Sequence, residues 1–544
     1  MQGFHPRVTA LALLHRPGIV LAAAALLACA GQALAQDAPT FPIRGYQIEG
    51  NSLLPQGTVS VTVMPFTGPK SSFETIQLAL EALEKAYLQA GYGSVRIEVP
   101  EQEIQDGVVK LLVVEARLER IVVEGAKHHD DANVLASLPA LRTGAVVNVD
   151  QLQRNLNLAN ESFAKNTAVT FRQSESTGQT DAIVRVVDDR PLRFIASLDN
   201  SGNVSTGRYR LGFSLLHANL FNRDHTLSAQ ALTSPTQLSK VAILGVGYRI
   251  PLYALGDSVD FTLGYSNVDS GRIDLFSVSG NGLILGARYN RQLASAGGWD
   301  HKVSFGLDRR NYGNSVVPAA GGGPSLVPSL RVTPLSVAYS GNLRSPQRDL
   351  SASLTLTHNL PVNSRGDSAA FNLPGGRAGA DAAFTTLKAS AHITERLSPD
   401  WSLRGALSAQ YTNDLLISAE QFGVGGADSV RGFAEREVAA DKGLRTGFEI
   451  WGPDMGPRSG VEGLRLQPVA FLDAAWVRFN VAPGTIVSQE IASIGLGLRG
   501  SWQRSASFKL DYGYVVKGAR NTAGSTTATQ RGNWRLHGSA MWFF

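Results

Sequence analysis

A glycine-rich stretch around one arginine is the part of this sequence best suited to specific chemistry. It reads Gly425-Gly426-Ala427-Asp428-Ser429-Val430-Arg431-Gly432-Phe433 and interrupts segments that alternate like β-strands. A guanidinium is always charged and carries five donors in a rigid fork. In a confined space it therefore needs a carboxylate partner, whereas in an open loop it would simply be solvated. These nine residues alone leave both interpretations open.

A candidate partner lies in residues 468–476, which alternate as in a barrel strand. One face carries Ala470, Leu472, Ala474 and Trp476. The other face carries Phe471, Asp473 and Ala475. If the first face meets lipid, Asp473 points into the lumen, and the small Ala475 leaves room for an incoming loop. We therefore expect Arg431 to pair with Asp473 inside a barrel; the alternative is that Asp473 only lines a polar lumen.

No enzyme constellation is found in the sequence. It contains no His-Glu-x-x-His pair, no Walker loop and no Gly-x-Ser-x-Gly elbow. The run His128-His129-Asp130-Asp131 could ligate a metal, but a solvated turn with acids at a helix start is the better interpretation. Residues 423–426 could cradle a phosphate, but no strand-to-helix context follows them. The sequence thus predicts a protein that is not an enzyme, without metal or cofactor.

From Pro191 to the end, the sequence alternates with the period of two that marks β-strands. Many of these segments are about nine to eleven residues long and carry aromatic residues near their ends, as expected of strands that cross a bilayer. Short turns such as 221–224 alternate with long loops such as 361–380. About 350 residues at roughly 22 per strand and connection predict an antiparallel barrel of about sixteen strands. A soluble sandwich or propeller is the alternative, but no blade-length repeat is present.

The last residues of the chain form one more alternating face. It consists of Trp534, Leu536, Gly538, Ala540, Trp542 and Phe544. A final strand that ends in aromatic residues suits the strand that closes a barrel, so Trp542 and Phe544 are predicted to lie at the closure.

Two small α+β modules precede the barrel. Residues 43–116 and 117–190 each read as a strand, two helices and two further strands. Residues 36–42 form a short leader before the first module. The apolar stripes of both modules are best explained by ordinary core packing.

The first 35 residues resemble a secretory signal. Arg7 and Arg16 give its positive end, an apolar core follows, and small residues precede Gln36. This segment holds two of the chain's 50 basic residues and none of its 45 acidic ones, so the remainder is close to neutral and nucleic-acid binding is not expected. The single cysteine, Cys29, lies within it; a lipoprotein signal cleaved there is a weak alternative. The mature chain then has neither disulfides nor cysteine metal sites.

Taken together, these motifs resemble the outer-membrane transporters of two-partner secretion, the TpsB or haemolysin secretion/activation protein family (ShlB/FhaC/HecB-like). Residues 421–433 resemble the family's inward-folded loop motif, with Phe433 in place of the usual tyrosine. The strand motif Phe-x-Asp-x-Gly is matched at Phe471 and Asp473, with Ala475 in place of glycine. Residues 198–207 resemble the start of the family's barrel, and the two modules resemble its POTRA domains.

The resemblance implies two POTRA modules in the periplasm, followed by a sixteen-stranded transmembrane β-barrel in the outer membrane of a Gram-negative bacterium, with an inserted loop at about 412–443. Such a pore secretes a large exoprotein of haemolysin or adhesin type without ATP. Its partners are that client's N-terminal secretion domain, outer-membrane lipid and the barrel-assembly machinery. The family often carries a plug helix; only about seven residues precede the first module here, so we expect the inserted loop to be the main obstruction.

Two other functions remain open at this stage. An insertase of the same superfamily would insert other barrels, but such proteins commonly have more than two POTRA domains. A passive porin would leave residues 43–190 without a role.

Overall fold

The computed structural model describes most of the chain after residue 38. The described ranges are 39–176, 178–204, 206–267, 271–273, 276–278, 281–313, 329–373, 376–481, 484, 486–520 and 528–544. The expected signal segment, Cys29 and the start of the leader lie outside these ranges. So does most of the long loop that begins after residue 313.

The first compact unit ends at Glu115 and contains the first module. Its elements are β1 (Phe41–Ile43), β2 (Gly45–Glu49), α2 (Gln56–Val63), η1 (Met64–Phe66), β3 (Gly68–Ser71), α3 (Phe73–Gln89), β4 (Arg96–Glu98) and β5 (Val108–Val114). The sheet has the order β2-β5-β4, and β1 pairs with β3. Helix α3 buries residues at helical spacing, among them Leu83 and Tyr87, while alternate residues of β5 are buried. Buried positions three to four residues apart mark α3 as a helix, and buried positions two residues apart mark β5 as a strand.

The second module begins the second compact unit, which also contains the barrel. Its elements are β6 (Arg117–Glu124), α4 (Asp131–Ala136), α5 (Val149–Ala159), β7 (Lys165–Gln173) and β8 (Gln179–Asp188). The sheet order is β6-β8-β7, which leaves β7 on an edge. Side-chain caps start both helices: Asp130 accepts from the amide of Asn133, and Asn148 accepts from that of Gln151.

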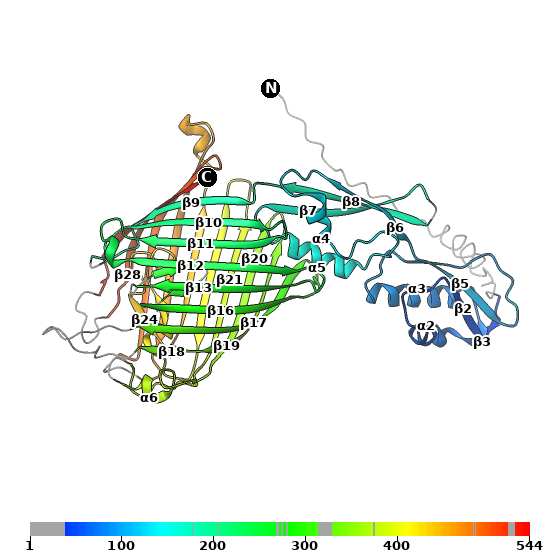
Figure 1. Ribbon diagram of the computed structural model, residues 1–544, viewed down its shortest axis with the longest axis horizontal. Helices are drawn as coiled ribbons and strands as arrows, with labels where there is room; N and C mark the ends of the chain where they lie inside the picture. Colours follow the sequence, from blue (N-terminus) through cyan, green and yellow to red (C-terminus); the bar gives the residue numbers. More distant parts are fainter. Residues whose placement is uncertain are drawn as a thin grey trace, which may run out of the picture. The chain divides into compact units, whose positions relative to one another are not determined.

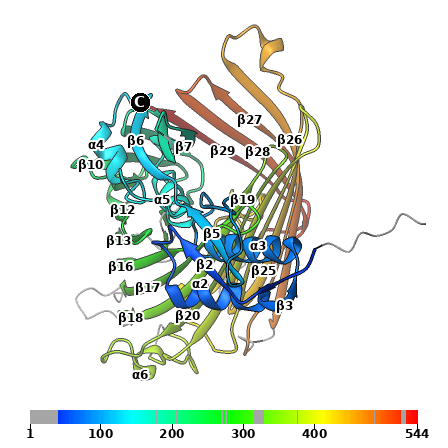
Figure 2. The ribbon, with the colours of Figure 1, turned by 90° about the vertical axis from the view of Figure 1, so that its right-hand side faces the viewer.

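The remainder is a closed barrel of antiparallel strands (Figures 1 and 2). Its strands are β9 (Leu192–Asp199), β10 (Arg210–Leu220), β11 (His225–Thr233), β12 (Ala242–Leu252), β13 (Asp257–Ser266), β16 (Asn281–Gln292), β17 (Trp299–Gly313), β18 (Leu330–Val332), β19 (Pro334–Arg344), β20 (Arg348–Asn359), β21 (Thr385–Arg396), β22 (Ser402–Tyr411), β25 (Lys442–Trp451), β26 (Leu464–Arg478), β27 (Ser488–Trp502), β28 (Ala506–Lys517) and β29 (Trp534–Phe543). Because β18 and β19 are separated by one residue and both pair with β17, they count as one strand of the barrel, which therefore has sixteen strands. The predicted fold class is confirmed.

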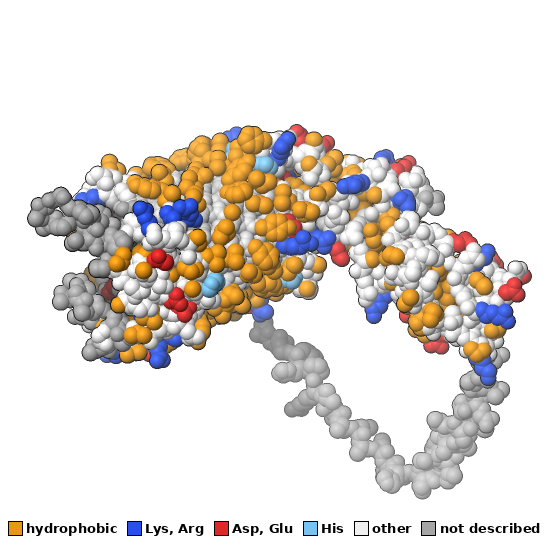
Figure 3. Space-filling view, turned by 60° about the horizontal axis from the view of Figure 1, so that its bottom comes forward, with side chains coloured by type: hydrophobic (Ala, Val, Ile, Leu, Met, Phe, Trp, Pro, Cys, Tyr) orange, Lys and Arg blue, Asp and Glu red, His pale blue; other side chains and the backbone are white. Residues whose placement is uncertain are grey.

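Hydrophobic side chains cover the outer wall of the barrel (Figure 3). In β26, Leu472 and Trp476 are exposed outward while Asp473 between them is buried, as the alternation predicts. Such an apolar band is what the hydrocarbon of a bilayer covers. No helix among the described residues is both long and apolar enough to cross a membrane.

The barrel closes between its first and last strands. Trp542 of β29 lies opposite Ala196 of β9. The backbones of Phe194 and Phe544 exchange two hydrogen bonds of 3.2 and 2.9 Å. Trp542 and Phe544 therefore lie at the closure, where the sequence placed them.

The second module is bonded to the turns at one end of the barrel. Lys165 of β7 donates to Asp224, in the β10–β11 turn, at 2.6 Å, and both side chains are buried. Asn133 and Tyr253 donate to the same carboxylate at 3.0 and 2.7 Å. Because an unpaired buried charge is costly, the bonds from Lys165 and Asn133 fix the module to the barrel, while Tyr253 holds Asp224 from a neighbouring turn of the barrel. The long connection between β20 and β21, which contains residues 361–380, lies at the opposite end of the strands, as predicted.

One segment leaves the wall and folds into the barrel. It connects β22 to β25 and contains η3 (Ser418–Glu420), β23 (Phe422–Val424) and β24 (Val438–Ala440). We call residues 412–441 the inserted segment. A hydrophobic cluster joins it to the wall through Ala475, Val477, Ile491 and Val515. Further small elements are η2 (Leu238–Lys240), β14 (Gly271–Ile273), β15 (Phe276–Val278), α6 (Ser368–Phe371) and η4 (Gly456–Ser459).

Candidate functional site

The tip of the inserted segment is a tight turn made possible by glycine. Gly425, Gly426 and Gly432 have φ values of 109°, 108° and 95°, which side chains rarely allow. The amide of Gly425 donates to Ser429 Oγ at 3.1 Å, and that of Ala427 donates to Glu435 at 2.8 Å. These amides are occupied within the segment itself, so the glycines shape the turn and do not form the phosphate cradle considered from the sequence.

The structure brings Arg431 onto Asp473. The Arg431 Nε and Nη2 atoms donate to the two carboxylate oxygens at 2.7 and 2.8 Å, and the Arg431 amide adds a third bond at 3.1 Å. Arg431 is 5% exposed and Asp473 is 1% exposed. A two-pronged, charge-assisted contact of this kind fixes both distance and orientation. The arginine is thus a buried anchor and not a solvated loop residue.

Two further carboxylates surround the same guanidinium. Arg431 Nη1 donates to Glu449 of β25 at 2.6 Å and lies 3.6 Å from Asp511 of β28. Arg499 of β27 bonds Asp511 at 2.6 Å and Glu449 at 3.3 Å. Two arginines therefore share three carboxylates across β25 to β28. We call Arg431, Arg499, Glu449, Asp473 and Asp511 the tip network; its alternating charges offset the cost of desolvation.

Aromatic and apolar contacts complete the tip. The guanidinium carbon of Arg431 lies 3.5 Å from the ring centroid of Phe471, a favourable cation–π position. Phe433 is fully buried and belongs to the same hydrophobic cluster as Ala475. The two positions at which the chain departs from the family's motifs therefore meet in one cluster, where each supplies apolar surface.

The final strand also reaches the tip. Gly432 donates its amide hydrogen to Nε2 of His537, on β29, at 3.0 Å. A Cβ at Gly513 of β28 would lie 2.7 Å from the Gly432 nitrogen, so the backbones approach as only glycine permits. The tip is thus held by wall strands from β25 to β29.

A second ion cluster holds the start of the inserted segment. Glu420 is buried and accepts two bonds from Nη1 of Arg310, on β17, at 3.0 and 3.2 Å. Tyr312 of the same strand donates to Glu420 at 2.6 Å. Asp308 accepts from the other nitrogen of Arg310 at 2.7 Å.

The end of the inserted segment is held in the same way. Asp441 is fully buried and accepts from Arg377, including a bond from Nη2 at 3.0 Å. It also accepts from the amides of Leu416 and Asn480 at 3.0 and 2.9 Å. We call Glu420, Asp441 and their two arginines the stem pairs. A hydrophobic cluster lies beside them, composed of Tyr312, Leu330, Val332, Ala370, Phe371, Ala380, Ala382, Phe384, Leu416 and Ile417.

Sequence reasoning found part of this site. Val430, Arg431, Gly432, Phe433, Phe471, Asp473 and Ala475 all lie at the tip. It missed Glu449, Arg499, Asp511, His537 and both stem pairs. Asp511 and His537 were within reach, because each alternates with apolar residues along its strand and so falls on the opposite, inward face.

The His128–Asp131 run needs one correction. Asp130 does cap α4, as expected, but His129 is buried and not part of a solvated turn. Its ring and amide both bond Asp188, at 3.1 and 2.9 Å. Burial raises the pKa of Asp188, but hydrogen bonds from residues 127–129 outweigh it and leave that pKa below its ordinary value. The described residues contain no group of three or more side chains able to hold a metal.

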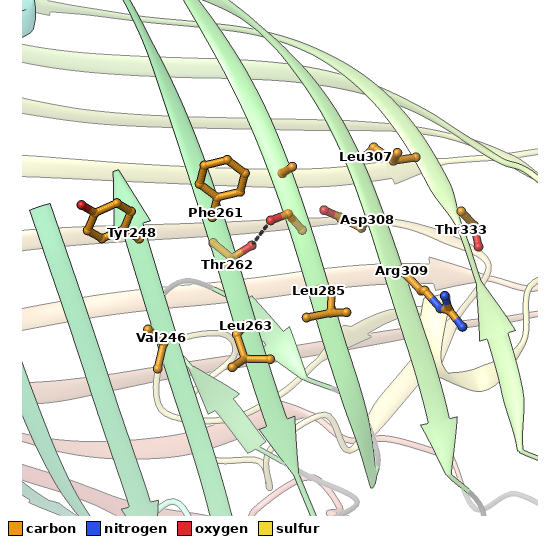
Figure 4. A pocket seen from close by; sticks show the side chains of 12 residues that line it. Val246, Tyr248, Phe261, Thr262, Leu263, Leu285, Leu307, Asp308, Arg309 and Thr333 are labelled. Carbon is orange, nitrogen blue, oxygen red and sulfur yellow. Dashed lines mark hydrogen bonds between the residues drawn. The ribbon is translucent and has the colours of Figure 1, made fainter. Parts of the chain in front are cut away.

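A hollow in the outer wall is not part of the site. It lies over β12, β13, β16 and β17 (Figure 4) and is lined mainly by outward apolar side chains such as Val246, Leu263 and Leu285. Its few polar members include Thr262, which donates to the Gly286 carbonyl at 3.3 Å. This surface belongs mainly to the apolar band of the barrel, and Asp308, which also lines the hollow, is already bonded to Arg310.

Comparisons with known proteins agree with this architecture. The family described as haemolysin secretion/activation protein ShlB/FhaC/HecB matches residues 178–500, and the ShlB-type POTRA domain matches residues 41–116. The chain is 24% identical over 422 residues to the outer membrane transporter CdiB of Dickeya dadantii, covering 75% of this chain and 72% of that protein. It is 24% identical over 457 residues to the hemolysin transporter ShlB of Serratia marcescens, covering 81% and 78%. The solved structure of CdiB from Escherichia coli superposes with a TM-score of 0.70 at 18% identity, covering 94% and 92%.

Proposed function

This chain belongs to the haemolysin secretion/activation protein family ShlB/FhaC/HecB, a family of outer-membrane transporters, and we propose that it exports a large partner exoprotein through its barrel. The client would be of haemolysin or adhesin type and would carry an N-terminal secretion domain. The observation that carries the proposal is the inserted segment, anchored in the lumen by Arg431 on Asp473. A segment inside the lumen whose ion pairs with the wall carboxylates pass through one arginine could be displaced by a passing chain.

The POTRA modules are proposed to capture the client. In the second module, β7 lies on a sheet edge, and its last four residues are exposed. An extended client segment can add a strand to such an edge through backbone bonds. In the sheet of the first module, β2 and β4 are the edge strands, and each offers a further edge to which a client segment could bind.

Transport is proposed to need neither ATP nor catalysis. The sequence lacks a Walker loop. An unfolded chain would move through the barrel as a hydrated strand, and its folding outside the cell would provide direction. The barrel itself would be inserted into the outer membrane by the barrel-assembly machinery.

Coexpression tests this function. The chain is expressed with a large protein that carries a secretion domain and is encoded nearby, and the client in the medium is measured with and without the chain. We expect secretion to depend on the chain. If the client reaches the medium equally well without it, export of that client is wrong, and insertion of other barrels or passive diffusion becomes the better explanation.

Deletion of residues 43–116 tests client capture. We expect this variant to assemble as a barrel, because the first module forms a compact unit of its own, but to lose the client in a pull-down. The matched control is the full chain carrying Arg431→Ala, which leaves both modules intact and should retain the client. Retained binding by the deletion variant would exclude the first module as the capture site.

A further inference from the structure

We propose that Asn200 and His537 are positioning residues that couple docking of the inserted segment to closure of the barrel between β9 and β29. This coupling is a property of the pore alone. It goes beyond the proposed export and does not depend on the identity of a client.

The junction between the first and last strands is short. Strands β9 and β29 align over five residue pairs, from Ser539 opposite Asp199 to Phe543 opposite Ile195. The neighbouring pair β28 and β29 aligns over nine. Residues 534–538 of β29 therefore lie beyond the regular ladder with β9, and something else must hold them to the first strand.

Asn200 supplies that contact. Its side-chain Nδ2 donates to the Leu536 carbonyl at 2.8 Å, and its Oδ1 accepts from the Gly538 amide at 2.9 Å. Its own amide donates to the Gly538 carbonyl at 3.2 Å. A side-chain amide has both a donor and an acceptor, so it can replace the rung of a ladder.

The two groups bound by Asn200 flank His537. Because alternate residues of a strand point to opposite faces, the imidazole of His537 points inward. It is buried, and its Nε2 accepts from Gly432 at the tip of the inserted segment at 3.0 Å. This bond requires Nε2 without a proton, which places the hydrogen on Nδ1.

Residues 536–538 of β29 thus form hydrogen bonds on two sides. Asn200 holds the backbone at Leu536 and Gly538 from the first strand, and Gly432 holds the side chain of His537 from the lumen. If the tip withdraws, His537 loses its inner partner and the strand its inner support. If Asn200 releases β29, His537 shifts and the buried Gly432 amide loses its acceptor. A coupling of this kind is reciprocal.

A disulfide reports closure of the junction. Ser197 and Met541 lie opposite each other in β9 and β29. Since Phe194 and Phe544 exchange both backbone bonds, the 197–541 pair is a non-bonded one, in which the Cα atoms approach most closely. The chain's one native cysteine is Cys29. The yield of the 197–541 disulfide in Ser197→Cys/Met541→Cys, reconstituted in lipid, therefore measures closure, and single-channel conductance measures docking of the tip.

Four variants in this background test the coupling. Arg431→Ala, at a residue whose own hydrogen bonds go to Asp473 and Glu449 and not to β9 or β29, should lower disulfide yield. Asn200→Ala, which does not touch the inserted segment, should raise conductance. His537→Ala should do both, with changes of roughly fivefold or more, the lower end of the range for coupled sites. His537→Gln, which keeps an acceptor, should restore both readouts. Ser539→Ala, on the same face of β29, is the neutral control.

The outcomes that refute the coupling are equally definite. Folding of each variant is first established by its resistance to unfolding in detergent. Disulfide yield unchanged in Arg431→Ala, or conductance unchanged in Asn200→Ala, would show that docking and closure are independent. A glutamine variant that behaves like alanine would show that His537 acts only by filling space, which removes it as a positioning residue.

Discussion

Buried ion pairs hold the inserted segment at two places, but the segment supplies the positive group at one place and the negative groups at the other. At the tip, the segment supplies an arginine and the wall supplies three carboxylates, Asp473, Glu449 and Asp511. At the stem, the segment supplies the carboxylates Glu420 and Asp441, which receive arginines from outside it.

The tip and the stem differ in the number of residues of the inserted segment that form the ion pairs. At the tip, every ion pair of the segment with the wall carboxylates described above passes through Arg431. At the stem, two carboxylates have separate arginines, and each also accepts from Tyr312 or from backbone amides. Loss of Arg431 removes all of these ion pairs at once, whereas loss of either stem carboxylate leaves the other one paired. The tip is therefore suited to act as a latch and the stem as a fixed base.

The largest expected effect is that of Arg431→Ala. Removing the guanidinium leaves Asp473 buried without its charge partner, which costs about 3–5 kcal/mol in typical buried pairs. We expect the tip to leave the wall and conductance to rise while the barrel still assembles. Secretion should fall, because a segment that no longer returns to Asp473 has no fixed place and stays in the path of the client. Arg431→Lys keeps the charge but not the forked guanidinium, so its conductance and secretion should lie between those of Arg431→Ala and those of the unchanged protein. Secretion unchanged in Arg431→Ala would remove the residue from the mechanism.

A smaller effect is expected of Glu420→Ala at the stem. It removes the bonds from Arg310 and Tyr312, and losses of bonds to a charged group are about 1.5–3 kcal/mol. Because Asp441 remains paired with Arg377, conductance should rise less than in Arg431→Ala. Glu420→Gln, with the same shape, is the matched control. If Glu420→Ala opens the pore as fully as Arg431→Ala, the stem is no more redundant than the tip.

The smallest effect is expected of Lys509→Ala. Lys509 donates to the Ala427 carbonyl at 3.2 Å and lies 3.4 Å from Asp428, but it is partly exposed. Exposed ion pairs contribute about 0–1 kcal/mol. Thermal unfolding and conductance should stay close to those of the unchanged protein. A change as large as that of Arg431→Ala would mean that the tip is held mainly from its edge.

Sequence reasoning predicted the fold and the tip because both follow from local periodicity. Alternation along β26 assigned Asp473 to the lumen, and the glycine-rich stretch supplied the arginine, only 42 residues earlier. The same alternation could have assigned Asp511 and His537. It could not assign the glycine turn's internal bonds, since these depend on side chains that only the folded segment brings together.

The stem pairs were beyond such reasoning for a physical reason. Glu420 lies in a non-periodic stretch, and 110 residues separate it from Arg310. Arg377 lies in a long connection for which no face can be assigned. His129 was misjudged because its partner, Asp188, is 59 residues away on β8. Periodicity tells which face a strand residue occupies, but not which distant loop will cover it.

For a client to pass, we expect that the tip must leave the wall. Asp428 and Lys509 lie on the two sides of this contact, so Asp428→Cys/Lys509→Cys can be bridged by a short bis-methanethiosulfonate, which forms a disulfide with each cysteine, releases methanesulfinate and is cleaved by a reducing agent. Client secretion is then measured before bridging, after bridging and after cleavage. We expect bridging to stop secretion and cleavage to restore it. Secretion that continues at its full rate while the tip is bridged would contradict it.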